Sequence, residues 1–226
     1  DAADDVDDVS SSSAVVDQTC ATPRPSDAEL SELATFPNPV LSDVDTAEEL
    51  AARGKTRIDV VFHVLRRSKG GAGDHSRARI DKTIAELDDA YAKSQFRLRL
   101  RAVTRTTSAA WYGMEFGSRA ERRAKRRLHR GSSETLNIYS AGGSGGWGTF
   151  PWWYADNPKL DGIVVKNDGG AGDTTYPHEV GHWLGLLHTH QDGCSGEGDH
   201  VSDTPAEADP GGVLQACVAQ NSCTGQ

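Results

Sequence analysis

The stretch "HEVGHWLGLLHTH", residues 178–190, holds four of the eight histidines of this 226-residue chain. On a helix, His178 and His182 lie one turn apart on the same face, with about 6 Å between their Cβ atoms. A continued helix would carry His188 roughly 9 Å further along the axis, at 1.5 Å per residue. Gly185 stands between them, and glycine adopts the left-handed conformation that ends a helix. The spacing H-E-x-x-H-x-x-G-x-x-H therefore predicts two histidines on a helix, a bend, and a third brought back beside them.

Three neutral imidazoles form a divalent metal site with an open fourth position, which is the pattern of catalytic zinc. Glu179 follows the first of them and faces that open position. Its carboxylate can take a proton from a zinc-activated water and return it to a leaving amine. The residues thus predict peptide hydrolysis without a covalent intermediate. The alternative is a helix with surface histidines, but a chance match to the whole spacing is rare. His190 has no part in this scheme and is expected at the surface.

The net charge of the chain is -9, and the charged residues are unevenly distributed along it. Residues 1–50 hold thirteen acidic residues and one basic residue, Arg24, whereas the remainder holds twenty acidic and twenty-three basic residues. Residues 1–17 are rich in Asp and Ser and are predicted to be disordered. The mean hydropathy is -0.55, and no apolar run is long enough for a membrane span. Because the chain begins at Asp1, we expect that a secretory signal has been removed.

Apolar periodicity predicts one sheet with helices, and therefore an α/β or α+β fold. Strands are expected from alternation or apolar runs, and helices from the 3.6-residue period and its caps. Ser26 and Glu29 form a capping box for a short helix, and a second short helix is expected over residues 46–54. The other expected elements are strands at 57–65, 95–103, 134–140 and 161–167, and helices at 77–94, 118–131 (ended by Gly131) and 176–187.

The helix expected at residues 118–131 carries seven basic residues. A solvated helix face explains them better than nucleic-acid binding, so no nucleic-acid partner is expected. The four cysteines form no C-x-x-C pair, which argues against a cysteine-zinc structural site. One or two disulfides in a secreted protein fit them better.

Beyond the histidines, the chain resembles the pappalysin group of the metzincin zinc endopeptidases. The resemblance lies in "TTYPHEVGHWLGLLHTH" (174–190), "GDHVSDTPAE" (198–207), "GWGTFP" (146–151), "DGIVV" (161–165) and "DVVFHVL" (59–65). It implies a metzincin-like fold: a twisted mixed sheet with a backing helix and a zinc-binding active-site helix. An acidic leader (1–53), partly disordered, would precede a catalytic domain (54–226).

The resemblance also implies roles for single residues. His178, His182 and His188 would bind zinc, and Glu179 would be the general base. The segment 146–151 would line the cleft and pair with extended substrate, although an ordinary loop is the alternative. "GDHVSDTP" would bind calcium or be only an acidic turn. The residues concerned are Gly146, Trp147, Gly148 and Thr149 for substrate, and Asp199 and Thr204 for calcium.

The cysteines and the C-terminus leave alternatives open. The resemblance pairs Cys194 with Cys223, and Cys217 with a cysteine beyond Gln226. Cys20 would either occupy the open zinc position as a latency switch or pair with Cys217. The family's methionine-containing turn is expected downstream, but the only methionine here is Met114. We therefore expect the C-terminal part of the catalytic domain to be missing from this chain.

The sequence thus predicts a secreted, monomeric zinc endopeptidase that acts on proteins or peptides and has no membrane partner. A catalytically silent zinc-binding or adhesion module, or a latent zymogen fragment, is the first alternative. A different zinc-hydrolase clan, with Glu207 as the third ligand, is the second. The intact Glu179 argues against the silent module, and Gly185 with His188 makes Glu207 unnecessary.

Overall fold

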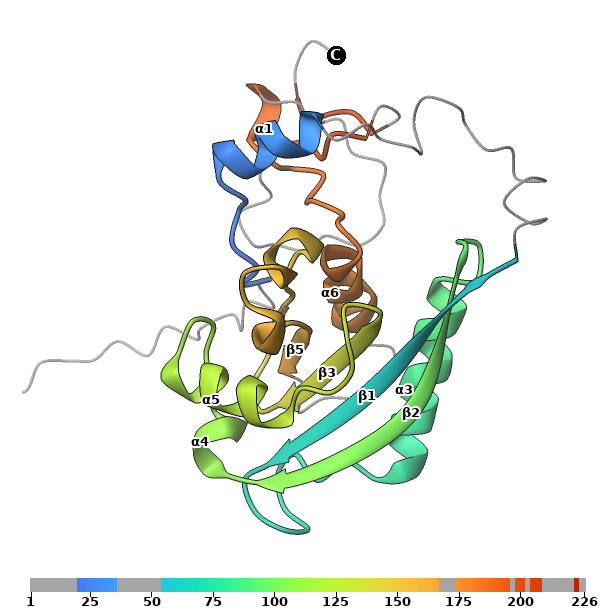
Figure 1. The fold of residues 1–226 in the computed structure, drawn as a ribbon, viewed down its shortest axis with the longest axis vertical. Helices are drawn as coiled ribbons and strands as arrows, with labels where there is room; N and C mark the ends of the chain where they lie inside the picture. The colour runs from blue at the N-terminus through green and yellow to red at the C-terminus, as the bar shows by residue number, and fades with distance from the viewer. Residues whose placement is uncertain are drawn as a thin grey trace, which may run out of the picture.

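A five-stranded mixed sheet forms the centre of the protein (Figure 1). The computed structural model describes residues 20–35, 54–166, 174–195, 198–201, 204–208 and 222–223. The strand order is β2-β1-β3-β5-β4, and only β4 is antiparallel to its neighbour. The strands are β1 (Thr56–Arg66), β2 (Phe96–Thr107), β3 (Thr135–Ala141), β4 (Gly146–Trp147) and β5 (Ile163–Lys166).

The burial of each strand follows its place in the sheet. The inner strand β1 is buried on both faces from Val60 to Leu65, as expected for a parallel strand with a neighbour on each side. The edge strand β2 alternates, and its arginines reach solvent. Two of them pair with β1, since Asp59 lies 2.7 Å from Arg99 and 3.2 Å from Arg101. Charged side chains along an exposed edge also discourage pairing with other chains.

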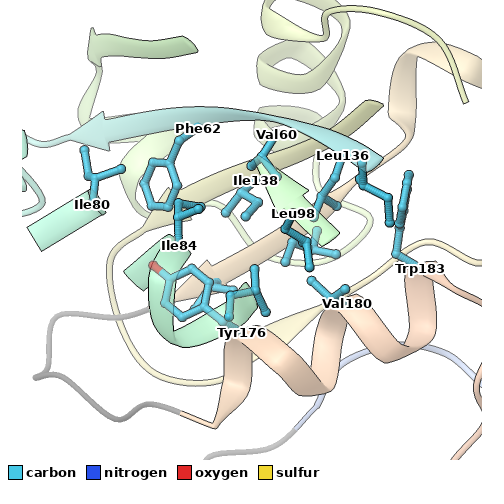
Figure 2. Close-up of a cluster of buried hydrophobic side chains, with 14 of the residues drawn as sticks. Val60, Phe62, Ile80, Ile84, Leu98, Leu136, Ile138, Tyr176, Val180 and Trp183 are labelled. Carbon is cyan, nitrogen blue, oxygen red and sulfur yellow. The ribbon is translucent and has the colours of Figure 1, made fainter. Parts of the chain in front are cut away.

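Helices α3 (Arg77–Ala90) and α6 (Thr175–Trp183) pack against one face of the sheet. Figure 2 shows their side chains meeting those of the strands: Ile80 and Ile84 from α3, and Tyr176, Val180 and Trp183 from α6. Helices α4 (Ala109–Tyr112) and α5 (Arg119–Leu128) contribute to a second buried cluster, around Leu65, Tyr139 and Trp147. Among the described residues, no helix is both long and apolar enough to cross a membrane.

Helix α1 (Asp27–Thr35) lies apart from the sheet, at the top of Figure 1. The predicted capping box is present: the Glu29 amide donates to Ser26 Oγ at 3.3 Å, and the Ser26 amide donates to Glu29 Oε2 at 2.7 Å. Short 3-10 helices at Pro151–Tyr154 (η1), Pro158–Leu160 (η2) and Gly193–Ser195 (η3) complete the described elements.

The predicted strands and helices of the body are confirmed, with shifts at their ends. Helix α5 ends at Leu128 and not at Gly131 as expected, because His129 is extended (φ -47, ψ 134). The next amide, of Arg130, donates to Asn137 Oδ1 at 2.9 Å, so contact with β3 draws the chain out of the helix. The disorder expected at 1–17 lies outside the described residues, and so does the helix expected at 46–54, apart from its last residue, Gly54. The boundary at residue 53 stays a prediction.

Candidate metal centre

Helix α6 presents His178 and His182 from one side while its other side is anchored in the core. Tyr176, Val180 and Trp183 are buried against the sheet. The hydroxyl of Tyr91, the residue that follows the last residue of α3, also donates to the carbonyl of Pro177 at 2.8 Å. The two imidazoles are therefore held on a helix whose position is fixed from two directions.

The predicted bend follows directly. Helix α6 ends at Trp183, and Gly185 has a φ of 100°, a conformation that other residues rarely adopt. The Leu186 amide donates back to the carbonyl of Gly181 at 2.9 Å, closing the last turn. After this reversal His188 lies beside the helix histidines, as the spacing predicts.

The three imidazoles converge on one point. The Nε2 atom of His182 lies 3.1 Å from those of His178 and His188, which are 3.3 Å apart. Nitrogens about 2.1 Å from a tetrahedral zinc ion are about 3.4 Å apart, so the spacing suits such an ion. His182 Nδ1 donates to the Leu186 carbonyl at 2.8 Å, which assigns the free lone pair to Nε2. Burial lowers the pKa of His182 to about 3, so its ring is neutral, as a metal ligand must be.

Cys20 completes this group from the other end of the chain. It is a free cysteine, and its Sγ lies 3.3 Å from His182 Nε2. The candidate ligand atoms of Cys20 and the three histidines all lie within 4.8 Å of one another. Cys20 also forms a parallel β-bridge with Gly146, and the Ala21 amide donates to the Gly146 carbonyl at 2.7 Å. Two roles were left open for Cys20: a ligand at the zinc position, or a disulfide with Cys217. The structure places Cys20 beside the histidines, as the first role requires.

Glu179 lies beside Cys20 and is fully buried. Its Oε2 accepts from Thr22 Oγ1 at 3.1 Å and lies 3.7 Å from Cys20 Sγ. Its Oε1 is buried and has no hydrogen-bond partner within the described part of the chain. Burial raises the pKa of Glu179 to about 7, which suits a group that gains and loses a proton near neutral pH.

The segment expected to bind substrate is the sheet edge, but only its backbone faces the histidines. A Cβ atom on Gly148 would lie 2.9 Å from the Glu179 carbonyl oxygen and 3.2 Å from His182 Cβ. Glycine is therefore required where the chain that leaves β4 crosses α6. The side chains of Trp147 and Thr149 turn to other partners, since the Trp147 indole donates to Glu121 at 2.6 Å and Thr149 Oγ1 donates to Asp161 at 3.0 Å.

The expected calcium loop is described only in part. Asp199 Oδ1 accepts from the Val201 amide at 3.0 Å, and the Thr204 amide donates to the Val201 carbonyl at 3.0 Å. Among the described residues, the only candidate group of metal-binding side chains is the one containing Cys20 and the histidines. Calcium binding stays a prediction.

Other predicted residues are placed as follows. The disulfide between Cys194 and Cys223 is present, and Cys217 lies outside the described residues. Glu207 accepts from Thr189 at 2.9 Å and is not in the histidine group. His190 is half-buried and stacks on His188 with ring centroids 4.7 Å apart, so treating it as a surface residue was wrong.

Two residues at the site were not found from the sequence. Thr22 contacts Glu179 across 157 positions. Asp161, 3% exposed, accepts from the Trp183 indole on α6 at 3.1 Å and from Thr149 next to β4. It thereby ties the histidine helix to the sheet edge. Neither residue has a local pattern that marks it, because each acts through partners far away in the sequence.

The chain is similar to known metalloproteases. A family model for M43 peptidases, described as pregnancy-associated plasma protein-A, matches residues 164–226. An extracellular metalloprotease of Colletotrichum graminicola is 31% identical over 88% of this chain and 75% of its own length. One from Pyricularia oryzae is 33% identical over 92% and 76%. These relatives confirm the pappalysin resemblance, the metalloprotease class and the extracellular location.

Solved structures extend the likeness to the fold. Mature mirolysin of Tannerella forsythia, in complex with a cleaved peptide, is 24% identical, with a TM-score of 0.55 over 69% of this chain and 73% of mirolysin. A promirolysin mutant matches with 22% identity and a TM-score of 0.56 over 84% and 76%. At this identity the likeness shows a shared fold, which confirms the metzincin-like architecture.

Proposed function

Because the chain belongs to the M43 (pappalysin) family of metalloproteases, we propose that it is a secreted zinc endopeptidase whose ion is held by His178, His182 and His188. The observation that carries this proposal is the convergence of three Nε2 atoms within 3.3 Å of one another. Unprotonated nitrogens this close repel one another unless a cation lies among them. The donor set of three imidazoles is the one that catalytic zinc uses.

Glu179 is the general base of the proposed reaction. A zinc ion held by the three imidazoles would supply a Lewis acid, which would polarise the scissile carbonyl and acidify the attacking water. Glu179 accepts the proton of that water while the water oxygen bonds to the carbonyl carbon. The same carboxyl then donates the proton to the leaving nitrogen as the peptide bond breaks, so it ends the cycle ionised as it began.

The edge of β4 is the proposed place of substrate binding. The carbonyl of Gly146 accepts from the Ala21 amide at 2.7 Å. The amide of Gly148 donates to Thr22 Oγ1 at 2.8 Å. An extended protein or peptide substrate would use the same main-chain groups by strand addition. The absence of a side chain at Gly148 lets this edge lie directly against α6, and therefore close to the histidines.

Cys20 holds the proposed enzyme latent. Its sulfur lies 3.3 Å from His182 Nε2, and within 4.8 Å of the other two histidine ligand atoms. A thiolate is a good zinc ligand, so the sulfur would serve as the fourth ligand. Residues 20–22 also occupy the sheet edge that substrate needs. The same segment thus blocks both the metal and the cleft, and the chain would act as a zymogen.

A pair of variants tests the base role of Glu179 and the latency role of Cys20 together. Cys20 has to be replaced first, because a latent chain has no activity that a change at Glu179 could reduce. Cys20→Ala should hydrolyse a denatured protein substrate, whereas Cys20→Ala with Glu179→Ala should be slower by about 10²–10⁴-fold. Both should hold equal zinc by elemental analysis. Equal activity in the two variants would rule out Glu179 as the base. An inactive but zinc-loaded chain that carries Cys20→Ala together with Thr22→Val, and so lacks both contacts of the leader with the site, would favour a silent zinc-binding module.

A further inference from the structure

Thr22 sits inside the candidate site although no function assigned so far uses it. It is two residues after Cys20, and only 8% of its surface is exposed. Its backbone amide lies 3.4 Å from Cys20 Sγ, so thiol and hydroxyl are presented together by one short turn of chain. Burying a hydroxyl is unfavourable unless it is hydrogen-bonded, and this one has two partners.

The two hydrogen bonds of the hydroxyl have a fixed direction. The Gly148 amide can only donate, and it donates to Thr22 Oγ1 at 2.8 Å. The single hydroxyl proton is then left for Glu179 Oε2, 3.1 Å away. One hydroxyl thus links the sheet edge to the proposed general base.

We propose that the cleft contains a hydroxyl-binding subsite, formed by the Gly148 amide and the Glu179 carboxylate, and that Thr22 fills it as a second hold on the leader. The hydroxyl accepts from the edge amide as a substrate carbonyl would, and donates to Glu179 as the attacking water would. Filling the subsite therefore occupies both groups at once, separately from the thiol at the metal position.

The subsite also defines a class of ligand. It fits an extended peptide that runs parallel to β4 and carries a thiol followed, two residues later, by a threonine or serine. This inference rests on the proposed function in one respect only, which is the role of Glu179 as the general base. The hold itself involves no metal ion, and it can be measured in metal-free protein.

Amide hydrogen exchange in the metal-free full chain tests the hold. The probe is the Ala21 amide, which donates to the Gly146 carbonyl and is released when residues 20–22 leave the edge. Thr22→Val keeps the shape of the side chain but leaves a buried amide and a buried carboxylate oxygen without this partner. Its Ala21 exchange should be faster by about tenfold or more. Thr22→Ser restores the hydroxyl and should stay within about threefold of the unaltered chain.

Two references keep the result interpretable. Exchange at Ala21 is expressed relative to the core amides of Val60 and Phe62, so that a general loss of stability cancels. Thr56→Val changes an exposed threonine at the start of β1 and should leave the ratio unchanged. An unchanged ratio in Thr22→Val, or the same rise in Thr22→Val and Thr22→Ser, would overturn the proposal. Since no zinc or peptidase activity enters the measurement, its failure is distinguishable from failure of the proposed function.

Discussion

At the scale of the residue, His63 and His182 show what separates a structural histidine from a candidate ligand. Both are buried, at 0% and 2% exposure. His63 has a hydrogen-bonding side chain at each ring nitrogen, Thr104 at 2.8 Å and Asn137 at 3.0 Å. His182 has the Leu186 carbonyl at one nitrogen, while the other faces two imidazoles and a thiol. The partner of the second ring nitrogen, rather than burial, therefore distinguishes the two roles.

His63 predicts a dependence of stability on pH. Burial lowers its pKa from 6.5 to about 4, so the folded protein resists its protonation. This contribution is complete above the unfolded pKa and is lost as the pH falls from 6.5 toward 4, because only the unfolded chain then gains the proton. His63→Gln does not titrate there. Between pH 7.5 and 4.5, urea denaturation should show the unaltered protein losing about 2.5 kcal/mol more unfolding free energy than the variant. Parallel losses in the two proteins would contradict this assignment.

Sequence reasoning at this scale succeeded where spacing along the chain carries the information. The positions of His178, His182 and His188 relative to Gly185 follow from helix geometry alone. Thr22 and Asp161 could not be found in this way, because their partners are set by how distant elements pack. Local pattern also said nothing of the stacking between His188 and His190.

At the scale of the element, the bend after α6 decides where the third imidazole lies. A Cβ atom on Gly185 would meet Pro151 Cγ at 3.6 Å and Trp152 at 3.9 Å, which are ordinary contacts. The demand for glycine there comes from its φ of 100° and not from lack of space. A side chain at this position would strain the backbone that carries His188.

Gly185→Ala tests the bend. The strain should cost about 1–3 kcal/mol, and relief of it by rotating the bend would weaken zinc binding by about tenfold or more. Gly117→Ala is the matched control, because Gly117 also has a positive φ (68°) and open space around it but lies away from the histidines. Urea denaturation should show a loss in both variants, and competition with a chromophoric chelator should show weaker zinc binding only in Gly185→Ala. Equal zinc affinities would mean that the bend does not position His188.

Elements were predicted well where periodicity is long and poorly where they are short. The sequence predicted β2 from its alternation of apolar and charged residues, and α3 from its apolar helical face. The two-residue strand β4 has no periodicity, and its place at the edge came only from the family resemblance. The end of α5 was misplaced because the hydrogen bond between Arg130 and Asn137 competes with helical continuation.

At the scale of the whole molecule, three distant parts of the sequence meet at one place. Cys20 and Thr22 come from the leader, Gly146 and Gly148 from the sheet edge, and the imidazoles from α6 and its bend. Away from the cleft the leader is held as well, since Arg24 pairs with Asp192 at 2.6 Å and Glu29 accepts from the Trp153 indole. A lone cysteine in an acidic segment cannot reveal such a meeting, so the sequence left the role of Cys20 open.

Anomalous diffraction above the zinc absorption edge, from crystals of the full chain grown with zinc, tests the central claim most directly. We predict one peak, about 2.1 Å from the Nε2 atoms of His178, His182 and His188 and about 2.3 Å from Cys20 Sγ. A map without a peak among these imidazoles, or with His188 turned away from it, would contradict the account.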